Sequence, residues 1–484
     1  MRIVVALRTF LLAAALLALA TVPAAAEVKN VILMVADGGG FNSWKAASLY
    51  QGKFGKQVYD GPGWVKHAVS TYALSRSNSP QKTGIQESDL VYAPARAWDR
   101  SPGGGVRKGG TGDFAGYNWL KSTPTDSAAA ATAMSTGRKT YDSAINWSDF
   151  DQPHSPTLAE LAKQHGKAVG VVTSVQWSHA TPAAFGDAHN RDRDDYAGIA
   201  NEMLSGDTLD VVLGAGNPDF DDNGEPASMD PKYVGGAETW GRLKAGKHPG
   251  GWKLVQTKEE FETLTAGPTP SRVLGTALVH RTLQAYRGGY DPADTPGSDP
   301  LIENVPSLQT MTEAALNVLD EDPDGLFLMV EGGAVDWANH QNQAARMIEE
   351  QTEFLKAVQA VVDWVEANSS WEETLLVLTA DHETGMLWGP NSDTVAYDPV
   401  VDNGAGKMPG LRYNSSKHTN SLVPLYARGA LSEEFAHVVD GEDATAEAAW
   451  GVGRYVDNTD LFEVLSAAVL SEAEVSTAVG GAGR

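Results

Sequence analysis

The chain has no cysteine among its 484 residues. This absence excludes disulfide bonds and every thiolate metal site, so a zinc ion could be bound only through histidine and carboxylate ligands. Basic residues are also scarce, because 37 Lys and Arg stand against 62 Asp and Glu, which gives a formal net charge of −25. Nucleic-acid binding depends on clustered cations, so this composition argues against a nucleic-acid-binding module.

Apolar runs long enough to enter a membrane are lacking after the N-terminus. Residues 1–26 combine a basic start at Arg2 and Arg8, an apolar stretch, and small residues at 24–26. This pattern is typical of a secretory signal peptide. We therefore expect residues 1–26 to be removed, leaving 27–484 as a periplasmic or extracellular protein with no membrane span. An uncleaved membrane anchor is the alternative.

Six unbroken apolar segments predict strands that are buried on both faces of a sheet. They are 31–35, 168–175, 209–213, 326–330, 375–378 and 422–426. Helical patterns lie between them, notably at 155–166 and from 337 to about 368. This alternation predicts a doubly wound α/β fold, with a mostly parallel sheet sandwiched by helices. Two regions with many Gly and Pro, at about 60–118 and 215–300, break the rhythm. We interpret them as insertions, the second as a candidate accessory subdomain.

Residue types that bind metals stand next to these strands. In chain order they are Asp37, His179, Thr181, Glu331, Asp336, His340, Asp381, His382 and His418. In an open α/β sheet, ligands bind outside the carboxyl ends of the strands. Asp336 and His340 are four residues apart, so at the start of a helix they share one face. Any one of these residues could be a helix cap or a turn residue, but their convergence predicts a metal site.

Ser127 precedes a run of four alanines, which is a strong helix-forming sequence. One interpretation is that Ser127 or Asp126 merely caps this helix. The other is that the Ser127 hydroxyl is a nucleophile at the positive end of the helix dipole, where phosphate also binds favourably.

Taken together, these segments resemble the alkaline phosphatase family. The resemblance is carried by Val35-Ala36-Asp37-Gly38, Asp126-Ser127-Ala128, His179-Ala180-Thr181-Pro182, the segment from Glu331 to His340, Asp381-His382-Glu383-Thr384-Gly385 and His418-Thr419-Asn420. They occur in the family's order between residue 29 and about 430. The resemblance implies metal-dependent hydrolysis of a broad range of small phosphate monoesters through a phosphoserine intermediate on Ser127. Because family members are often dimers, it also implies a homodimer.

The resemblance further implies two Zn²⁺ ions and one Mg²⁺ ion. It assigns Asp336, His340 and His418 to the first zinc, Asp37, Asp381 and His382 to the second, and Asp37, Thr181 and Glu331 to magnesium. A phosphate-binding arginine is expected at Arg193, with Arg191 as the competing choice.

Two residues around the metals depart from some family members. His179 and Trp337 stand where certain bacterial enzymes have Asp and Lys, and both resemble a cold-adapted or marine bacterial subgroup. His179 could orient a magnesium-bound water or attract a third zinc, since imidazole suits zinc and hard oxygen ligands suit magnesium.

Three alternatives stay open at this point. The wider superfamily includes phosphodiesterases and sulfatases, which share the motifs around Asp37 and Asp381. A non-catalytic exported protein could use the same metals for stability, but it would not need Ser127 and Arg193. Residues 219–230 resemble a calcium-binding loop with Asp230 in place of Glu, although a glycine turn at the surface is the simpler interpretation.

Overall fold

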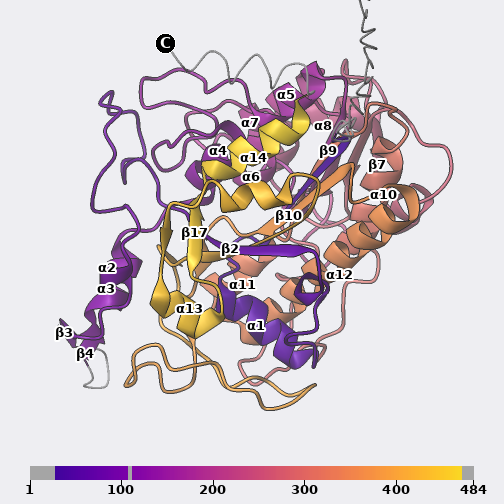
Figure 1. Ribbon diagram of the computed structural model, residues 1–484. Helices are drawn as coiled ribbons and strands as arrows, with labels where there is room; N and C mark the ends of the chain where they lie inside the picture. The colour runs from indigo at the N-terminus through magenta and orange to yellow at the C-terminus, as the bar shows by residue number, and fades with distance from the viewer. Residues whose placement is uncertain (1–27, 107–111, 471–484) are drawn as a thin grey trace, which may run out of the picture.

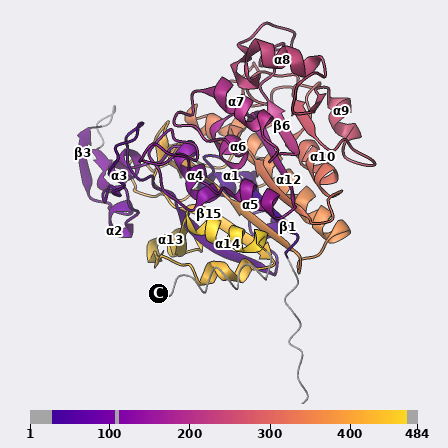
Figure 2. The same cartoon turned by 90° about the horizontal axis from the view of Figure 1, so that it is seen from above.

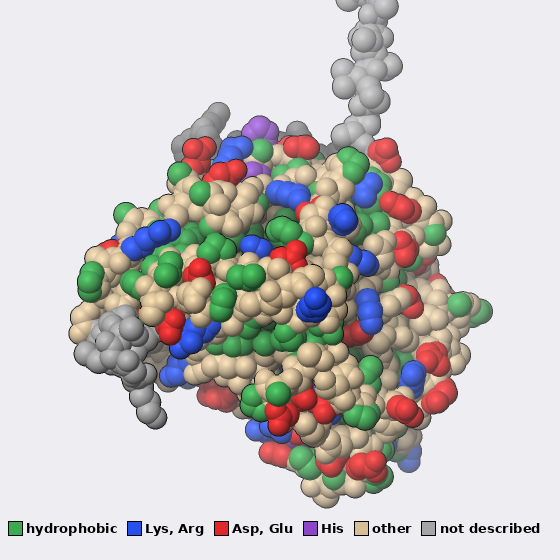
Figure 3. All heavy atoms as spheres, turned by 90° about the horizontal axis from the view of Figure 1, so that it is seen from below, with side chains coloured by type: hydrophobic (Ala, Val, Ile, Leu, Met, Phe, Trp, Pro, Cys, Tyr) green, Lys and Arg blue, Asp and Glu red, His purple; other side chains and the backbone are tan. Residues whose placement is uncertain are grey.

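The computed structural model describes residues 28–106 and 112–470. The predicted signal peptide, 1–26, lies outside the described residues. None of the helices within the described ranges combines the length and apolar character that crossing a bilayer requires. Seen from below, the surface carries scattered acidic and basic side chains (Figure 3).

An eleven-stranded sheet forms the centre of the molecule. In spatial order its strands are β16 (Gly441–Glu442), β17 (Arg454–Asp457), β2 (Trp64–Ser70), β15 (Val423–Gly429), β10 (Thr374–Thr379), β1 (Asn30–Val35), β9 (Leu326–Glu331), β5 (Ala168–Gln176), β6 (Val211–Ala215), β8 (Val273–Thr276) and β7 (Lys253–Val255). The strands from β10 to β7 all run parallel, and β15 runs antiparallel to β10. The six predicted strands are confirmed, but the sixth enters the sheet in the opposite direction.

Helices cover both faces of this sheet. Among them are α1 (Phe41–Tyr50), α4 (Ser127–Thr136), α5 (Leu158–Gln164), α6 (Ala180–Phe185), α7 (Tyr196–Ser205), α10 (Leu308–Leu319), α11 (Ala334–His340), α12 (Ala344–Asn368) and α14 (Asp460–Val469). Figure 1 shows α4, α5 and α14 on one side of the sheet and α1, α11 and α12 on the other. The mostly parallel sandwich predicted from the sequence is therefore confirmed.

Alternate residues of β1 build the two halves of the core. Val31 and Leu33 pack in the cluster that includes α4, α5 and α14, while Ile32 and Met34 pack in the cluster that includes α1, α10 and α12. All four side chains are fully buried. Successive side chains of a strand point to opposite faces, so a strand covered on both sides must be apolar throughout.

The two helices predicted from the sequence differ from the observed ones: one begins later, and the other is interrupted. Helix α5 starts at Leu158, after a reciprocal capping box between Thr157 and Glu160, so Ser155 and Pro156 lie outside it. The long helix expected from 337 is two helices, because the chain breaks at 341–343, where Asn342 takes a positive φ of 56°. Asp336 and His340 consequently lie in the short helix α11.

The two segments that break the alternation lie at opposite ends of the molecule (Figure 2). Within 60–118, β2 joins the central sheet, and α2 (Pro94–Ala97), β3 (Pro102–Val106), β4 (Gly112–Phe114) and α3 (Ala115–Ser122) follow it. Within 215–300, β7 and β8 extend the far edge of the sheet, accompanied by α8 (Gly236–Lys244) and α9 (Lys258–Thr263). Helix α13 (Ala444–Trp450) lies between β16 and β17 in the chain.

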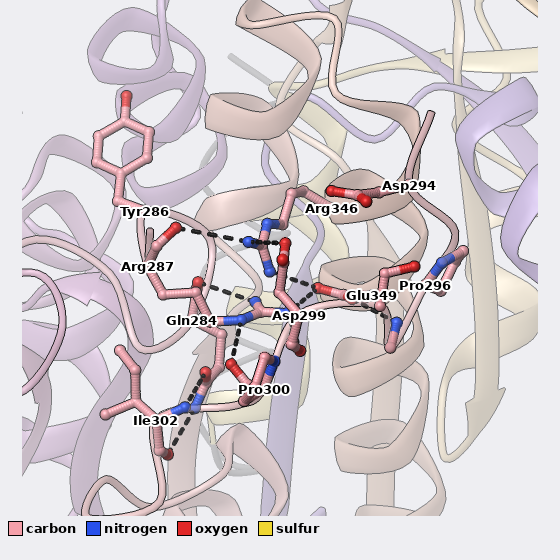
Figure 4. A network of polar contacts seen from close by, with 12 residues as sticks. Gln284, Tyr286, Arg287, Asp294, Pro296, Asp299, Pro300, Ile302, Arg346 and Glu349 are labelled. Atoms are coloured by element: carbon pink, nitrogen blue, oxygen red, sulfur yellow. Dashed lines mark hydrogen bonds and ion pairs between the residues drawn. The ribbon is translucent and has the colours of Figure 1, made fainter. Parts of the chain in front are cut away.

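A pair of buried arginines fixes the loop of residues 284–302 to helix α12 (Figure 4). Arg346 contacts Asp299 at 2.5 Å and Glu349 at 3.3 Å, and Arg287 contacts Glu349 at 2.8 Å. The arginine side chains are only 2% and 3% exposed. Arg287 also donates to the carbonyl of Pro300 at 3.0 Å. Because the charges are paired and hydrogen-bonded, this loop is held although it lacks regular structure.

We expect Arg346→Met to lower the free energy of unfolding by about 3 kcal/mol, since it leaves the largely shielded carboxylates of Asp299 and Glu349 without this partner. Thermal unfolding followed by calorimetry measures the effect as a lower midpoint. Arg242→Met is the matched control, because Arg242 pairs with Glu238 on the surface, where such pairs contribute about 0.5 kcal/mol. Equal midpoints for the two variants would show that the buried pair does not hold the loop.

Candidate active site

Three neighbouring parallel strands deliver carboxylates to one edge of the sheet. Val35 of β1 pairs with Glu331 of β9 on one side and with Thr379 of β10 on the other. Asp37 and Asp381 each follow two residues after their paired positions, so they leave the sheet side by side. The carboxyl ends of parallel strands therefore bring these acids together, as the sequence predicts.

Asp37, Asp381 and His382 form a fully buried group. His382 Nε2 lies 3.2 Å from Asp381 Oδ2 and 3.6 Å from Asp37 Oδ1. The other Asp381 oxygen accepts hydrogen bonds from the backbone N–H groups of Gly38 at 3.1 Å and His382 at 2.9 Å. These bonds turn the chain after β10, so adjacent residues 381 and 382 both face the group. Neither Asp37 oxygen accepts a hydrogen bond from the described residues.

A second group joins Asp336 and His340 of α11 to His418. His418 belongs to β14 (His418–Thr419), which pairs with β11 (Glu383–Thr384) directly after the Asp381 turn. His418 also precedes β15, and because that strand is antiparallel, its start lies where the parallel strands end. The imidazole nitrogens His340 Nε2 and His418 Nε2 are 3.0 Å apart, and each lies within 3.6 Å of an Asp336 oxygen.

The hydrogen bonds of the two imidazoles fix which nitrogens face each other. His340 Nδ1 donates to the carbonyl of Ser416 at 2.8 Å, and His418 Nδ1 donates to that of Thr125 at 3.0 Å. Both Nε2 atoms are therefore left to point at one another, with their lone pairs available. Two such nitrogens approach to 3.0 Å only with a proton or a cation between them. This arrangement is typical of metal-ligating histidines oriented by a backbone carbonyl.

The pKa values of the clustered acids and imidazoles, in the protein without ions, show that this cluster needs a positive charge. Burial and the neighbouring Asp381 raise the pKa of Asp37, and burial followed by the charge of Asp336 raises the pKa of Asp381 to about 7. Although burial lowers it, the hydrogen bond with Asp336 raises the pKa of His340 to about 9. Without a cation Asp37 and Asp381 therefore favour the protonated form, because burial and mutual repulsion destabilise their charges.

The donor sets fit divalent cations. Asp336, His382 and His418 place ligand atoms within 4.8 Å of one another, and so do Asp37, Asp381 and His382. His382 is common to both groups, so the two groups are adjacent. Glu331 Oε1 and Thr181 Oγ1 are buried without a hydrogen-bond partner among the described residues, and burial raises the pKa of Glu331 to about 8. Nitrogen and carboxylate ligands suit zinc, whereas oxygen-only ligands suit magnesium.

Ser127 is the first residue of α4 and is 2% exposed. Its hydroxyl oxygen lies 3.1 Å from His382 Nε2, so it borders the cluster of acids and imidazoles directly. Asp126 caps the helix by accepting a hydrogen bond from the N–H of Ala129 at 2.9 Å. The cap residue is thus Asp126, and the free N-terminal N–H groups of the helix surround Ser127 with positive potential.

The second carboxylate oxygen of Asp126 holds Arg193. Arg193 contacts it at 2.9 Å, and the N–H of Ser143 donates to it at 3.0 Å. The Arg193 side chain is 17% exposed, whereas that of Arg191 is 62% exposed and lies 3.5 Å from Asp151. Of the two arginines considered in the sequence, only Arg193 contacts the residue that precedes Ser127.

The remaining predicted residues, His179 and Trp337, lie against each other beside the cluster. Their rings are 5.5 Å apart, and the His179 ring also stacks near Tyr196 at 6.1 Å. Burial, followed by the charge of Arg193, lowers the pKa of His179 to about 3. His179 Nδ1 has no hydrogen-bond partner among the described residues, so this imidazole is neutral and keeps a nitrogen available.

Three residues of the site were not singled out from the sequence. Asp126 was weighed only as a helix cap, Thr384 donates to Asp336 at 2.6 Å, and Thr173 donates to Glu331. Thr384 could have been found from its place two residues after His382. Thr173 lies inside the apolar strand β5, where nothing in the local pattern marks it.

Residues 219–230 form a set of turns and ion pairs. Asp219 accepts from Trp240 at 2.9 Å and from Lys244 at 2.7 Å, Asp221 accepts from the backbone of Asn223 at 2.8 Å, and Asp230 caps a short helix. No group of three metal-ligating side chains forms here among the described residues. The carboxylates of these residues already take part in hydrogen bonds and ion pairs within the protein, which agrees with a surface turn.

The fold and sequence match known proteins. The alkaline phosphatase family model matches residues 111–460. Alkaline phosphatase 3 of Bacillus subtilis (strain 168) is 35% identical over 54% of this chain, and the match spans 49% of that relative's own length. Alkaline phosphatase H of Pseudomonas aeruginosa (strain UCBPP-PA14) is 28% identical over 77% of this chain and 86% of the relative.

Among solved structures, the alkaline phosphatase of the Antarctic bacterium TAB5 superposes with a TM-score of 0.59. The match covers 92% of this chain and 99% of that enzyme at 22% sequence identity, which supports the common fold. The family model covers most of the chain, including the helix of Ser127 and the segments of Glu331, Asp381 and His418. On these grounds, the chain belongs to the alkaline phosphatase family, whose members depend on metal ions.

Proposed function

We propose that the protein hydrolyses phosphate monoesters to an alcohol and inorganic phosphate through a phosphoserine intermediate on Ser127. One observation carries this proposal: a buried serine at a helix N-terminus has its hydroxyl 3.1 Å from an imidazole of a carboxylate–imidazole cluster. Arg193 lies at the same helix end through Asp126, so a nucleophile and a phosphate-binding cation are available together.

We assign Asp336, His340 and His418 to one Zn²⁺, Asp37, Asp381 and His382 to a second, and Asp37, Thr181 and Glu331 to one Mg²⁺. These ions would supply Lewis-acid stabilisation of oxyanions and lower the pKa of water at the site. The contacts of His340 with His418 and Asp336, those of His382 with Asp37 and Asp381, and the unpartnered oxygens of Glu331 and Thr181 support this division.

The chain's own residues then have distinct tasks. The Ser127 oxygen gives its proton to solvent and attacks phosphorus. The new O–P bond forms, the bond to the alcohol oxygen breaks, and the leaving alcohol oxygen takes up a proton from solvent. Arg193 binds two phosphate oxygens and offsets their charge, since a guanidinium matches them with two parallel hydrogen bonds. Water then attacks the phosphoserine, which releases phosphate and restores the Ser127 hydroxyl.

The same assignment of residues predicts that the protein hydrolyses a broad range of small phosphate monoesters. Every residue given a role here acts on the phosphoryl group or on the ions, and none is assigned to the alcohol. We also propose that residues 1–26 direct export to the periplasm or the medium, and that the mature protein forms a homodimer, as the family resemblance implies. Its lack of cysteine fits either compartment, because no disulfide has to form.

We expect Ser127→Ala to lower turnover of nitrophenyl phosphate by on the order of 10⁴-fold, because the variant lacks the attacking oxygen. Zinc and magnesium content, measured by elemental analysis, should stay near the wild-type level. Ser135→Ala is the matched control, since Ser135 is a buried serine at the other end of the same helix and bonds to Asn146.

The outcomes separate the proposed activity from the alternatives. Near-normal turnover in Ser127→Ala would rule out this nucleophile. Faster hydrolysis of bis-nitrophenyl phosphate or nitrophenyl sulfate by the wild type would favour a phosphodiesterase or a sulfatase.

We expect Arg193→Lys to weaken competitive inhibition by inorganic phosphate about tenfold, because an ammonium group cannot bind two oxygens in the same fork geometry. Arg191→Lys is the control and should leave the inhibition constant unchanged, since Arg191 is exposed and points to Asp151. The reverse ranking of the two variants would transfer the phosphate-binding role to Arg191.

We expect dialysis against EDTA to abolish activity and to lower the melting temperature. Without cations, the buried Asp37, Glu331 and Asp381 must either repel one another as carboxylates or take up protons, and both destabilise the folded state. Adding zinc and magnesium back should restore both properties, as followed by differential scanning calorimetry and the phosphatase assay on one sample. A melting temperature and activity that EDTA does not change would contradict the metal assignment.

A further inference from the structure

A cavity of about 1120 Å³ lies between helix α12, the end of helix α1 and the chain from 296 to 310. One wall is the loop that Arg287 and Arg346 fix to α12 (Figure 4). Its lining includes Leu283, Ile302 and Val305, so a large part of the surface is apolar. The volume lies just above the range of about 300–1,000 Å³ that is typical of small-molecule sites.

Glu350 of α12 lines this cavity and is 5% exposed. Its side chain makes no hydrogen bond or ion pair with the described residues, and its Oε1 is fully buried. A carboxylate removed from water without a partner is unstable, so an unpaired buried acid of this kind needs an explanation. Burial, followed by the charges of Glu349 and Glu353, raises the pKa of Glu350 to about 8, so this carboxyl is stable in its ionised form only when a cation lies beside it.

The neighbouring charged groups do not neutralise Glu350. The nearby cations are already paired with other carboxylates. Arg287 and Arg346 both contact Glu349, and Lys356 contacts Glu353 at 2.5 Å. The lining as a whole contains five glutamates and two lysines. The cavity is therefore complementary to a positive charge.

We propose that this cavity binds an organic ammonium ion with an aliphatic body, with the ammonium group against Glu350 and the body against Leu283, Ile302 and Val305. A divalent metal ion is disfavoured, because no group of three metal-ligating side chains forms in this lining among the described residues. An ammonium donor matches a single carboxylate, and an aliphatic body matches the apolar wall.

The cavity is distinct from the candidate active site. It reaches Ser174 of β5, the neighbour of the Thr173 that bonds to Glu331, but its lining contains none of the assigned metal ligands. Binding at this place is consequently independent of the proposed phosphatase activity, and its test does not rely on turnover.

The test is isothermal titration calorimetry of the metal-replete protein with octylammonium chloride, below the concentration at which it forms micelles. We expect one saturable site. Octanol lacks the charge, octyl sulfate reverses it, and ammonium chloride lacks the aliphatic body, so each should bind at least about tenfold more weakly. Equal binding of octylammonium and octanol, or no saturable site, would overturn the proposal.

A substitution of Glu350 tests whether octylammonium binds at this residue. Glu350→Gln keeps the shape of the side chain and removes its charge, and it should weaken octylammonium binding on the order of tenfold or more. Glu366→Gln is the matched control, because Glu366 lies on the same helix, is exposed and does not line the cavity. Unchanged affinity in Glu350→Gln would overturn the assignment.

A second variant avoids changes in the core. Leu301 lines the cavity but is 56% exposed, so Leu301→Lys should leave the fold intact while adding a positive charge to the lining. We expect a several-fold loss of octylammonium affinity and no loss of octanol affinity. Equal effects on both probes would contradict recognition of the charge.

Discussion

The structure depends on bringing several acids and imidazoles closer together than their own charges allow. Asp37, Asp381 and His382 are fully buried, with His382 Nε2 within 3.6 Å of both acids, and the Nε2 atoms of His340 and His418 meet at 3.0 Å. In the protein alone, raised carboxyl pKa values and a protonated imidazole would be needed to hold this arrangement. A cation satisfies the same donors without protons, so metal binding and folding of this edge of the sheet are linked.

The pairing register of the parallel strands brings these acids close together. Strands β1, β9 and β10 are neighbours in space but begin at residues 30, 326 and 374, and their pairing sets the acids at one level. Strand β15 contributes through its direction, because an antiparallel strand starts where the parallel ones end. His418 consequently reaches the site from the start of a strand, whereas Asp37 and Asp381 reach it from the ends of theirs.

The sequence predicted the parts of the fold that have a local signal. Unbroken apolar runs located β1, β5, β6, β9, β10 and β15, since strands covered on both faces must be apolar throughout. The direction of β15 had no such signal, because residues 422–426 are equally apolar in either orientation. The break at 341–343 was missed because apolar residues at helical spacing stand on both sides of the polar run 339–343. Thr173 was missed for a related reason: its bond to Glu331 joins residues 158 positions apart.

Asp126 shows why a helix cap and a functional residue need not be alternatives. One of its oxygens accepts from the N–H of Ala129 and fixes the start of α4, while the other contacts Arg193. The position of Ser127 and the position of the guanidinium are therefore set by a single carboxylate. In a chain without disulfides, such shared polar contacts do the work of linking distant segments: Asp126 joins 126 to 193, and Arg346 joins α12 to the loop of 284–302. Each is effective because its charges are largely shielded from solvent, where an ion pair that loses one partner leaves a poorly compensated charge.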